Sequence, residues 1–197
     1  MRAIASGDRA LSSRLLREQP ALASTQLVKG AGRREAESYY FPEIGHYAYA
    51  GATALHIAAG AYREDLVRKL LSRGADVRAR DRRGAEPLHK ASVGQPGSHA
   101  WNPIRQIATI RCLLEAGADS NAAASGEVTP LHRAVRTRCA DAVRALLIGG
   151  ANPGLRTKRG STLIALATQN TGREGSGSPE AKEQQREILA LLREHQT

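Results

Sequence analysis

Cysteine is scarce in this chain of 197 residues, and long apolar segments are missing. The two cysteines, Cys112 and Cys139, show neither CxxC spacing nor a paired histidine motif, so we expect free thiols and no zinc site. No apolar run of about 18 residues occurs, and the N-terminus has too few apolar residues for a signal peptide. We therefore expect a soluble, cytoplasmic protein that does not bind membranes.

Catalytic motifs are also absent from the sequence. The chain has no nucleophile elbow around a serine, no HExxH helix and no DxDxDG loop. Glu43 has no second carboxylate at a spacing that would support acid–base chemistry. We expect neither an enzyme nor a metal or cofactor site.

One motif recurs along the chain. In Thr129-Pro130-Leu131-His132 a hydroxyl side chain precedes a proline, which is typical of a helix N-cap and the first helical residue. Equivalent motifs begin at Thr53, Glu86 and Thr162, in steps of 33, 43 and 33 residues. A second apolar stripe follows each motif and predicts a second helix; the stripes are Val67/Leu70/Leu71, Ile110/Leu113/Leu114, Val143/Leu146/Leu147 and Ile188/Leu191/Leu192. Such short helix pairs need neighbours of the same shape to be stable.

This pattern resembles the ankyrin-repeat family, whose repeat of about 33 residues is a β-turn and two helices with a T-P-L-H-x-A signature. The resemblance implies an all-α solenoid with an N-terminal helical cap and four helix-turn-helix repeats that carry inserted loops. The chain departs from the signature at Ala54 and Glu86, and the last repeat has lost both proline and histidine. In this family the histidine helps to bind one repeat to the next. We therefore expect structural roles for His56, His89 and His132.

We expect one domain over residues 1–197, because a repeat array forms one continuous core. Its predicted parts are a capping repeat (1–23), an insertion with an aromatic cluster (24–48), repeat 1 (49–80), repeat 2 with an insertion (81–123), repeat 3 (124–156) and a terminal repeat with an insertion (157–197). The leucines expected in the core are Leu55, Leu71, Leu88, Leu114, Leu131 and Leu147.

The formal net charge of +10 favours acidic partners. The resemblance places much of this charge on one concave side of the array, on the fingers that connect repeats and on the first helices beside them. The residues concerned are Arg78, Arg80, Arg82, Arg83, Lys90, Arg133, Arg156, Lys158 and Arg159. The alternative is that these are ordinary solvated charges.

Aromatic residues are few, but five of the seven lie within residues 39–49. Because each aromatic side chain buries a large apolar area, we expect this segment to fold onto the array. The preceding residues, 24–36, are polar and contain glycine, and we expect them to be mobile. The aromatic segment either fills the groove of the first repeat or forms a recognition surface with Tyr47 and Tyr49 as anchors.

Two further insertions, residues 93–103 and 169–179, interrupt the turns between the helices of their repeats. We expect them to emerge at the end of the array opposite the fingers and to share one surface with the turn at residues 136–141. Backbone N–H groups, hydroxyls and arginines there are the ingredients of an anion site. The candidate ligand-binding residues are Trp101, Arg136, Arg138 and Arg173. Alternatively, the inserts are flexible linkers and Trp101 anchors its loop against the array.

The resemblance implies a non-catalytic scaffold for protein–protein interaction. Together with the charge, it predicts a monomer that binds an acidic protein through the concave groove and the fingers. Nucleic-acid binding is an alternative, because a basic groove beside exposed tyrosines could combine phosphate attraction with base stacking. The third alternative is a small anion or phosphorylated ligand at the inserted turns.

Overall fold

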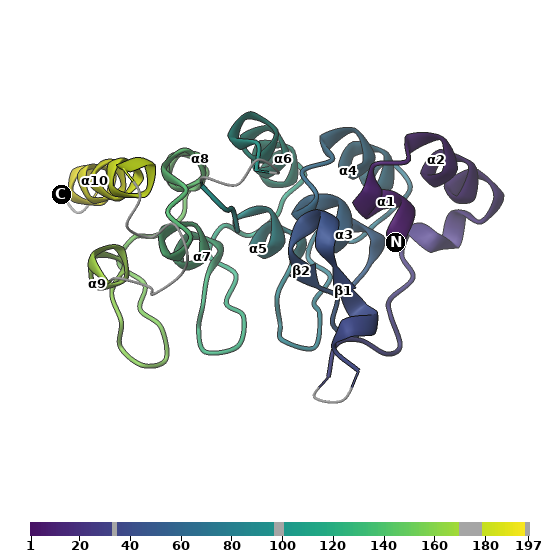
Figure 1. The fold of residues 1–197 in the computed structure, drawn as a ribbon, viewed down its shortest axis with the longest axis horizontal. Coiled ribbons are helices and arrows are strands. Elements are labelled where there is room, and N and C mark those ends of the chain that lie inside the picture. Colours follow the sequence, from purple (N-terminus) through teal and green to yellow (C-terminus); the bar gives the residue numbers. More distant parts are fainter. Residues whose placement is uncertain (33–34, 97–100, 170–178, 196–197) are drawn as a thin grey trace.

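The computed structural model describes residues 1–32, 35–96, 101–169 and 179–195. Over these residues the chain forms consecutive pairs of short helices stacked side by side (Figure 1). Helices α1 (Arg2–Ser6) and α2 (Arg9–Glu18) form the N-terminal pair. The four pairs that follow are α3 (Ala54–Gly60) with α4 (Glu64–Leu71), α5 (Pro87–Ala91) with α6 (Pro103–Glu115), α7 (Pro130–Arg136) with α8 (Ala140–Ile148), and α9 (Leu163–Thr168) with α10 (Pro179–Glu194). The predicted all-α solenoid, with a helical cap and four helix pairs, is confirmed.

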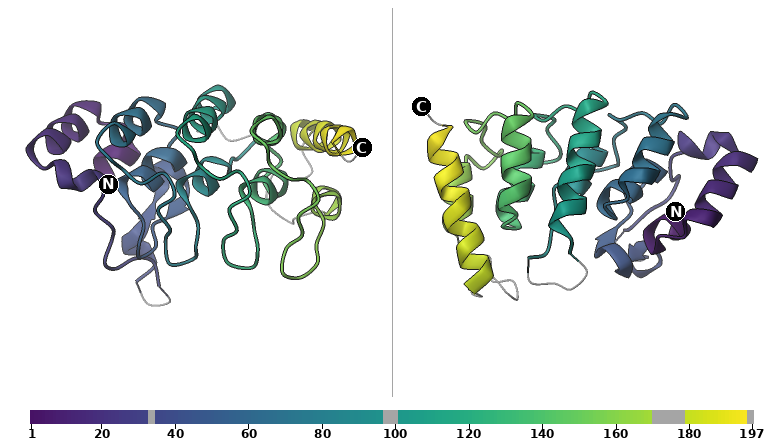
Figure 2. Two further views of the ribbon diagram at one scale, coloured as in Figure 1. Left: turned by 180° about the vertical axis from the view of Figure 1, so that it is seen from behind. Right: turned by 90° about the horizontal axis from the view of Figure 1, so that it is seen from above.

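The helices form two layers. In Figure 1 the second helices of the pairs lie in one row above the first helices, and the loops that connect successive repeats hang below. Seen from above, the helices of the upper row run side by side (Figure 2). We call the connecting loops finger 1 (residues 76–85), finger 2 (119–128) and finger 3 (152–161). The first helices and the fingers together border one side of the array, the side predicted to be concave.

Two motif histidines connect successive repeats. The Thr53 N–H donates to Nδ1 of His56 at 3.1 Å, so the proton of the neutral ring lies on Nε2, which donates to the Ala85 carbonyl at 2.9 Å. His89 is held in the same way and donates to the Val128 carbonyl at 3.0 Å. Burial lowers the pKa of His56 to about 4 and the pKa of His89 to about 3, so both rings are neutral at pH 7. The predicted structural role of these two histidines is confirmed.

The third motif histidine, His132, makes no such connection. Its Nδ1 accepts from the Thr129 N–H at 3.2 Å, but its Nε2 has no hydrogen-bond partner in the part of the chain that the structure describes. Burial lowers the pKa of His132, and the Leu155 carbonyl opposes this without reaching hydrogen-bonding geometry. His132 therefore caps α7, which confirms its predicted structural role, and its Nε2 interacts with finger 3 only loosely, through the Leu155 carbonyl.

The core lies between the two helical layers. Four of the six leucines predicted for it are buried: Leu55, Leu88, Leu131 and Leu147. The prediction is wrong for Leu71 and Leu114, which are half-buried. The leucine before each of them, Leu70 or Leu113, is fully buried, so the apolar stripe faces the core one residue earlier than expected.

The aromatic insertion packs on the array. A small antiparallel hairpin, β1 (Tyr40–Phe41) and β2 (His46–Tyr47), encloses the short helix η3 (Pro42–Ile44). It follows the short helices η1 (Pro20–Ala23) and η2 (Glu37–Tyr39). Phe41 and Ala48 are buried within the main hydrophobic core. The prediction that residues 39–49 fold onto the array is confirmed.

The segment before the hairpin is held more firmly than expected. The Leu27 N–H donates to the Ala52 carbonyl at 2.9 Å, the Gly51 N–H donates to the Leu27 carbonyl at 2.8 Å, and the Ala31 N–H donates to the Ala48 carbonyl at 2.8 Å. The prediction of a mobile segment is therefore wrong for residues 24–32, because their backbone pairs with residues 48–53. Residues 33–34 lie outside the described part of the chain.

Three further expectations concern chemistry outside the fold itself. No helix in the described ranges is both long and apolar enough to cross a membrane. Cys112 and Cys139 are buried and unpaired, which confirms the free thiols. The same ranges contain no group of three or more histidine, cysteine, aspartate or glutamate side chains arranged to hold a metal ion.

Candidate binding cleft

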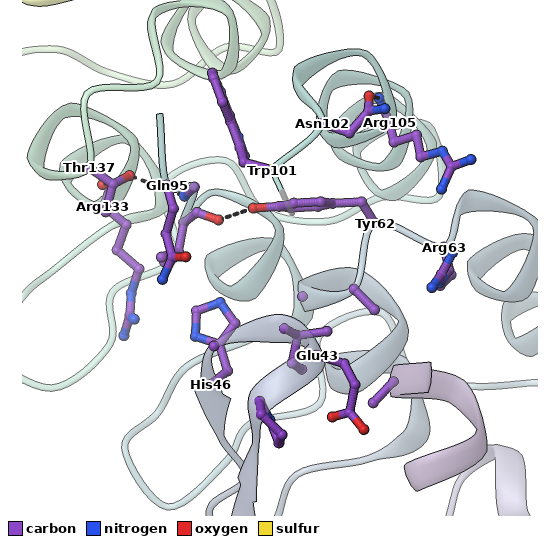
Figure 3. Close-up of a pocket in the computed structure, with 18 of the residues that line it drawn as sticks. Glu43, His46, Tyr62, Arg63, Gln95, Trp101, Asn102, Arg105, Arg133 and Thr137 are labelled. Atoms are coloured by element: carbon purple, nitrogen blue, oxygen red, sulfur yellow. Dashed lines mark hydrogen bonds between the residues drawn. The ribbon is translucent and has the colours of Figure 1, made fainter. Parts of the chain in front are cut away.

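A cavity of about 740 Å³ lies on the side of the array that the fingers border, where the hairpin meets repeats 1 to 3. We call it the cleft. One wall is residues 42–46 of the aromatic insertion, a second is formed by the ends of helices and the second insertion, and a third by α7 and the fingers (Figure 3). The polar residues of these walls include Glu43, His46, Tyr62, Arg63, Arg83, Gln95, Trp101, Asn102, Arg105, Ser125, Arg133, Arg136 and Thr137.

The second insertion is fixed at this cleft by specific hydrogen bonds. The Tyr62 hydroxyl donates to the Val93 carbonyl, and the Gly94 N–H donates to Oγ1 of Thr137 at 3.3 Å. A side chain at Gly94 would collide with the indole of Trp101 and the thiol of Cys139, at 2.5 Å from each, so only glycine allows this close approach. The described part of the insertion is therefore held in place by hydrogen bonds and close packing, and it forms a wall of the cleft.

Trp101 anchors this insertion. Its Nε1–H donates to Oε1 of Gln106 at 2.9 Å, and Nε2 of Gln106 donates to the Ala91 carbonyl at 2.9 Å. The indole is half-buried against the core. Its polar edge is thus already satisfied by the protein.

The charge of the cleft is strongly positive. Five arginines line it, and Glu43 is the only acidic residue among the lining residues. Arg83 and Arg136 are exposed, whereas Arg133 is half-buried. His46 is also half-buried, and burial, followed by the charges of Lys90 and Arg133, lowers its pKa to about 4. At pH 7 the cleft therefore combines a neutral imidazole with an excess of guanidinium groups.

A charged cluster supports the floor of the cleft. The Tyr49 ring centroid lies 4.4 Å from Cζ of Arg83, 5.1 Å from Nζ of Lys90 and 5.8 Å from Cζ of Arg82. Lys90 Nζ lies 3.0 Å from Oδ2 of the buried Asp81. Burial lowers the pKa of Lys90, although the attraction of Asp81 opposes this. Burial would raise the pKa of Asp81, but the charge of Lys90 and hydrogen bonds from Lys90 and the backbone outweigh burial, so the pKa of Asp81 is lowered. Tyr49 and Lys90, predicted as contact residues, are thus largely committed to internal packing.

Three exposed arginines of finger 1 that are predicted to contact a partner also make internal bonds. Arg80 pairs with Glu86 at 3.0 Å between Nη2 and Oε1. Arg78 Nε donates to the Gly117 carbonyl at 3.0 Å, and Arg82 Nη2 donates to the Ala31 carbonyl at 2.7 Å. Arg83 is the finger 1 arginine that lines the cleft.

The remaining predicted partner-binding residues lie outside the cleft, at different positions on the array. Lys158 and Arg159 line a second cavity of about 640 Å³ between α7 and finger 3, and Arg156 lies exposed nearby on the same finger. Tyr47 is 41% exposed and packs on Tyr40, with 4.9 Å between ring centroids, rather than on the cleft.

The four predicted ligand-binding residues do not all lie at one site. Trp101 lines the cleft, and Arg136 lines both cavities. Arg138 is buried and its Nη2 donates to the Gln169 carbonyl at 3.5 Å. Arg173 lies outside the described residues.

The second insertion and the basic groove border one cavity, whereas the prediction placed the insertion at the end of the array opposite the fingers. Gln95 of the second insertion and Ser125 of finger 2 line the same cavity. The physical reason is the shortness of α5, whose residues Pro87–Ala91 separate the turn from the finger by little more than one helical turn. The sequence-based prediction also missed His46, Tyr62 and Asn102. Tyr62 could have been found from its place directly after α3. This turn of repeat 1 is equivalent to the turn of repeat 2 that carries the second insertion.

Two protein-family models match parts of this chain. A family model described as "Ankyrin repeat" matches residues 50–82, and one described as "Ankyrin repeats (many copies)" matches residues 113–167. The chain is an ankyrin-repeat protein. Ankyrin repeats generally mediate protein–protein interaction.

Three similar curated proteins illustrate the comparison. Ankyrin repeat and SOCS box protein 16 of Mus musculus is 38% identical over 117 residues, which are 59% of this chain and 25% of the relative. BCL-6 corepressor-like protein 1 of Homo sapiens is 36% identical over 123 residues, which are 62% of this chain and 6% of the relative. Tyrosine-protein kinase Shark of Drosophila melanogaster is 33% identical over 120 residues, which are 60% of this chain and 12% of the relative. This ankyrin-repeat protein thus spans a quarter or less of each of these relatives.

Proposed function

We propose that this ankyrin-repeat protein binds an acidic segment of a partner protein in the cleft. The observation that carries the proposal is the composition of the cleft walls, with five arginines and a single carboxylate. Such a surface repels a basic partner, and it attracts and orients an acidic one. Its volume of about 740 Å³ is that of a typical ligand pocket, which suits a few side chains of a partner loop rather than a flat protein face.

The residues proposed to carry binding differ from those expected on finger 1. Arg83 and Arg136 are exposed in the cleft and free to steer an acidic segment towards it. Arg80 is less suitable, because its guanidinium already neutralises Glu86. The half-buried Arg133 lies deeper and is suited to holding the bound segment.

Nucleic-acid binding is less favoured by these contacts. Sequence-tolerant binding of single strands needs open aromatic faces for base stacking. The Tyr49 ring is covered by Arg82, Arg83 and Lys90. Tyr47 packs on Tyr40 instead of opening into the cleft.

Fluorescence anisotropy can test the proposal with a short labelled peptide of mixed aspartate, glutamate and leucine. We expect the peptide to bind, and the version with asparagine and glutamine in place of the acids to bind at least about tenfold more weakly. The double variant R83E/R136E should lose about tenfold in affinity, because two attractions of about 0.2–1 kcal/mol each become repulsions.

The matched control is R73E/R111E, which makes the same change of net charge at two exposed positions outside both cavities. This control should reduce affinity no more than about threefold, through the long-range field alone. An equal loss in both double variants would refute a specific role for the cleft. Competition by a single-stranded oligonucleotide at equal strength would favour the nucleic-acid alternative.

A further inference from the structure

Two arginines of the cleft, Arg133 and Arg63, have a buried nitrogen without a partner among the described residues, and they lie on opposite sides of the cavity. The buried nitrogen of Arg133 is Nε, and the guanidinium of Arg133 forms no ion pair among the described residues. Buried polar groups almost always have a partner, because an unpaired one loses its hydration without compensation. Lys90, the other predicted cationic contact residue that is not exposed, is paired with Asp81. Arg133 also has Arg83 and Arg136 as charged neighbours, so an anionic ligand at this side of the cavity would complete its hydrogen bonds and offset their charge.

The surroundings of Arg133 have an excess of positive charge. Arg83 and Arg136 line the same cavity, and Lys90 lies across the Tyr49 ring from Arg83. Asp81 is the carboxylate of this cluster, so four cations face one anion. Burial, and then the charges of Arg136 and Arg83 against the attraction of Asp81, lower the pKa of Arg133.

Neutral donors stand beside these charges. In Figure 3 Arg133, Gln95 and Thr137 lie on one side of the cavity with His46, while Arg63 and Arg105 lie on the opposite side. Gln95 carries an amide N–H group, and the neutral His46 carries one ring N–H. An oxyanion placed here would meet fixed guanidinium groups and one or two neutral donors.

We propose that the end of the cleft bordered by Arg83, Arg133 and Arg136 binds the phosphate of a phosphate monoester. A monoester carries a charge of about −1.5 to −2 at neutral pH, which offsets the excess of cations better than one carboxylate does. Its three oxygens accept the paired N–H groups of guanidinium forks, which is the recognition for which arginine is suited. The ligand is a phosphorylated side chain within the acidic segment. The inference rests on the proposed function for its place in the cleft.

Three peptides of otherwise identical acidic sequence test the inference, with phosphoserine, glutamate or alanine at one central position. Binding to the full chain would be measured by isothermal titration calorimetry at one ionic strength. We expect the phosphoserine peptide to bind at least about tenfold more tightly than the glutamate peptide at about pH 7.5. This preference should fall several-fold near pH 5.5, where the phosphate approaches a single negative charge.

Two variants separate the proposed site from the general charge of the cleft. R133M keeps the length and apolar stem of the side chain, and it should remove most of the preference for phosphoserine. R105M removes an arginine from the opposite side of the same cavity, and it should keep that preference. R136M, at an exposed position, repeats the test where folding is not at risk.

The outcomes distinguish this inference from the proposed function. Equal binding of the phosphoserine and glutamate peptides, or an unchanged preference in both R133M and R136M, would overturn the phosphate site and leave acidic-segment binding intact. Failure of all three peptides to bind would overturn both proposals. Free O-phosphoserine that binds as tightly as its peptide would support the site and identify a phosphorylated small molecule as the source of the phosphate.

Discussion

Acid should destabilise the array through the two histidines that bridge its repeats. The folded-state pKa values of His56 and His89, about 4 and about 3, lie below the ordinary value of 6.5. Between these pKa values the histidines of the unfolded chain are protonated, whereas those of the folded chain stay neutral. The free energy of unfolding therefore falls as pH falls below about 6.5. The stabilisation is complete above that pH.

The magnitude follows from the two shifts. At about pH 5 each unfolded histidine is almost fully protonated, whereas each folded one is almost neutral, so each contributes a loss of ~2 kcal/mol relative to about pH 8. The two together predict a loss of ~4 kcal/mol, and the half-buried His46, whose pKa is also about 4, adds a smaller loss to it. The rings of His56 and His89 are at most 1% exposed, so solvent screens their effects little.

Urea unfolding followed by circular dichroism at the two pH values measures this loss. H89Q removes one titrating ring, so its loss of stability between about pH 8 and pH 5 should be smaller than that of the unmodified chain by ~2 kcal/mol. H195Q, at an exposed position after α10, should keep the full pH dependence. The reasoning is refuted if stability is flat over this range, or if H89Q and the unmodified chain lose the same amount.

Two further predictions concern packing. Leu131→Ala removes a side chain that is 1% exposed, and it should reduce the free energy of unfolding by about 2–5 kcal/mol in urea titrations, whereas a change within error would contradict the repeat register. In hydrogen exchange followed by mass spectrometry, residues 39–49 should be protected because the hairpin packs on the core through Phe41 and Ala48, and exchange as fast as in an unfolded peptide would mean that the hairpin opens independently.

The repeat register, the helix pairs and the bridging role of His56 and His89 were predictable, because each depends on a motif that recurs at a fixed spacing. The identity of the cleft arginines was not. Arg82 and Arg83 are neighbours in the sequence, yet one donates to the Ala31 carbonyl and the other lines the cleft. That division depends on where residues 24–32 pack, which no local pattern in the sequence specifies.

The position of the hairpin likewise decided which predicted surfaces meet. Residues 42–46 close the finger side of the array against the second insertion, and this joins two regions that the sequence suggested were apart. The aromatic content predicted that the segment would pack, because large apolar side chains avoid water. It did not predict the place of packing, because any exposed apolar groove of the array satisfies the same requirement.

The missing bridge from His132 has a consequence for the order in which the array comes apart. In a linear array stability is approximately a sum of terms for units and for the interfaces between neighbours, so a weakened interface becomes a natural point of separation. Among the described residues, two of the three interfaces between the four repeats carry a hydrogen-bonded histidine bridge, whereas the last has side-chain bonds such as that from the Ala140 N–H to Oε1 of Gln184 at 2.8 Å. The terminal repeat should therefore unravel first and rejoin last, while repeats 1 to 3, which contain the cleft, stay assembled as one cooperative block.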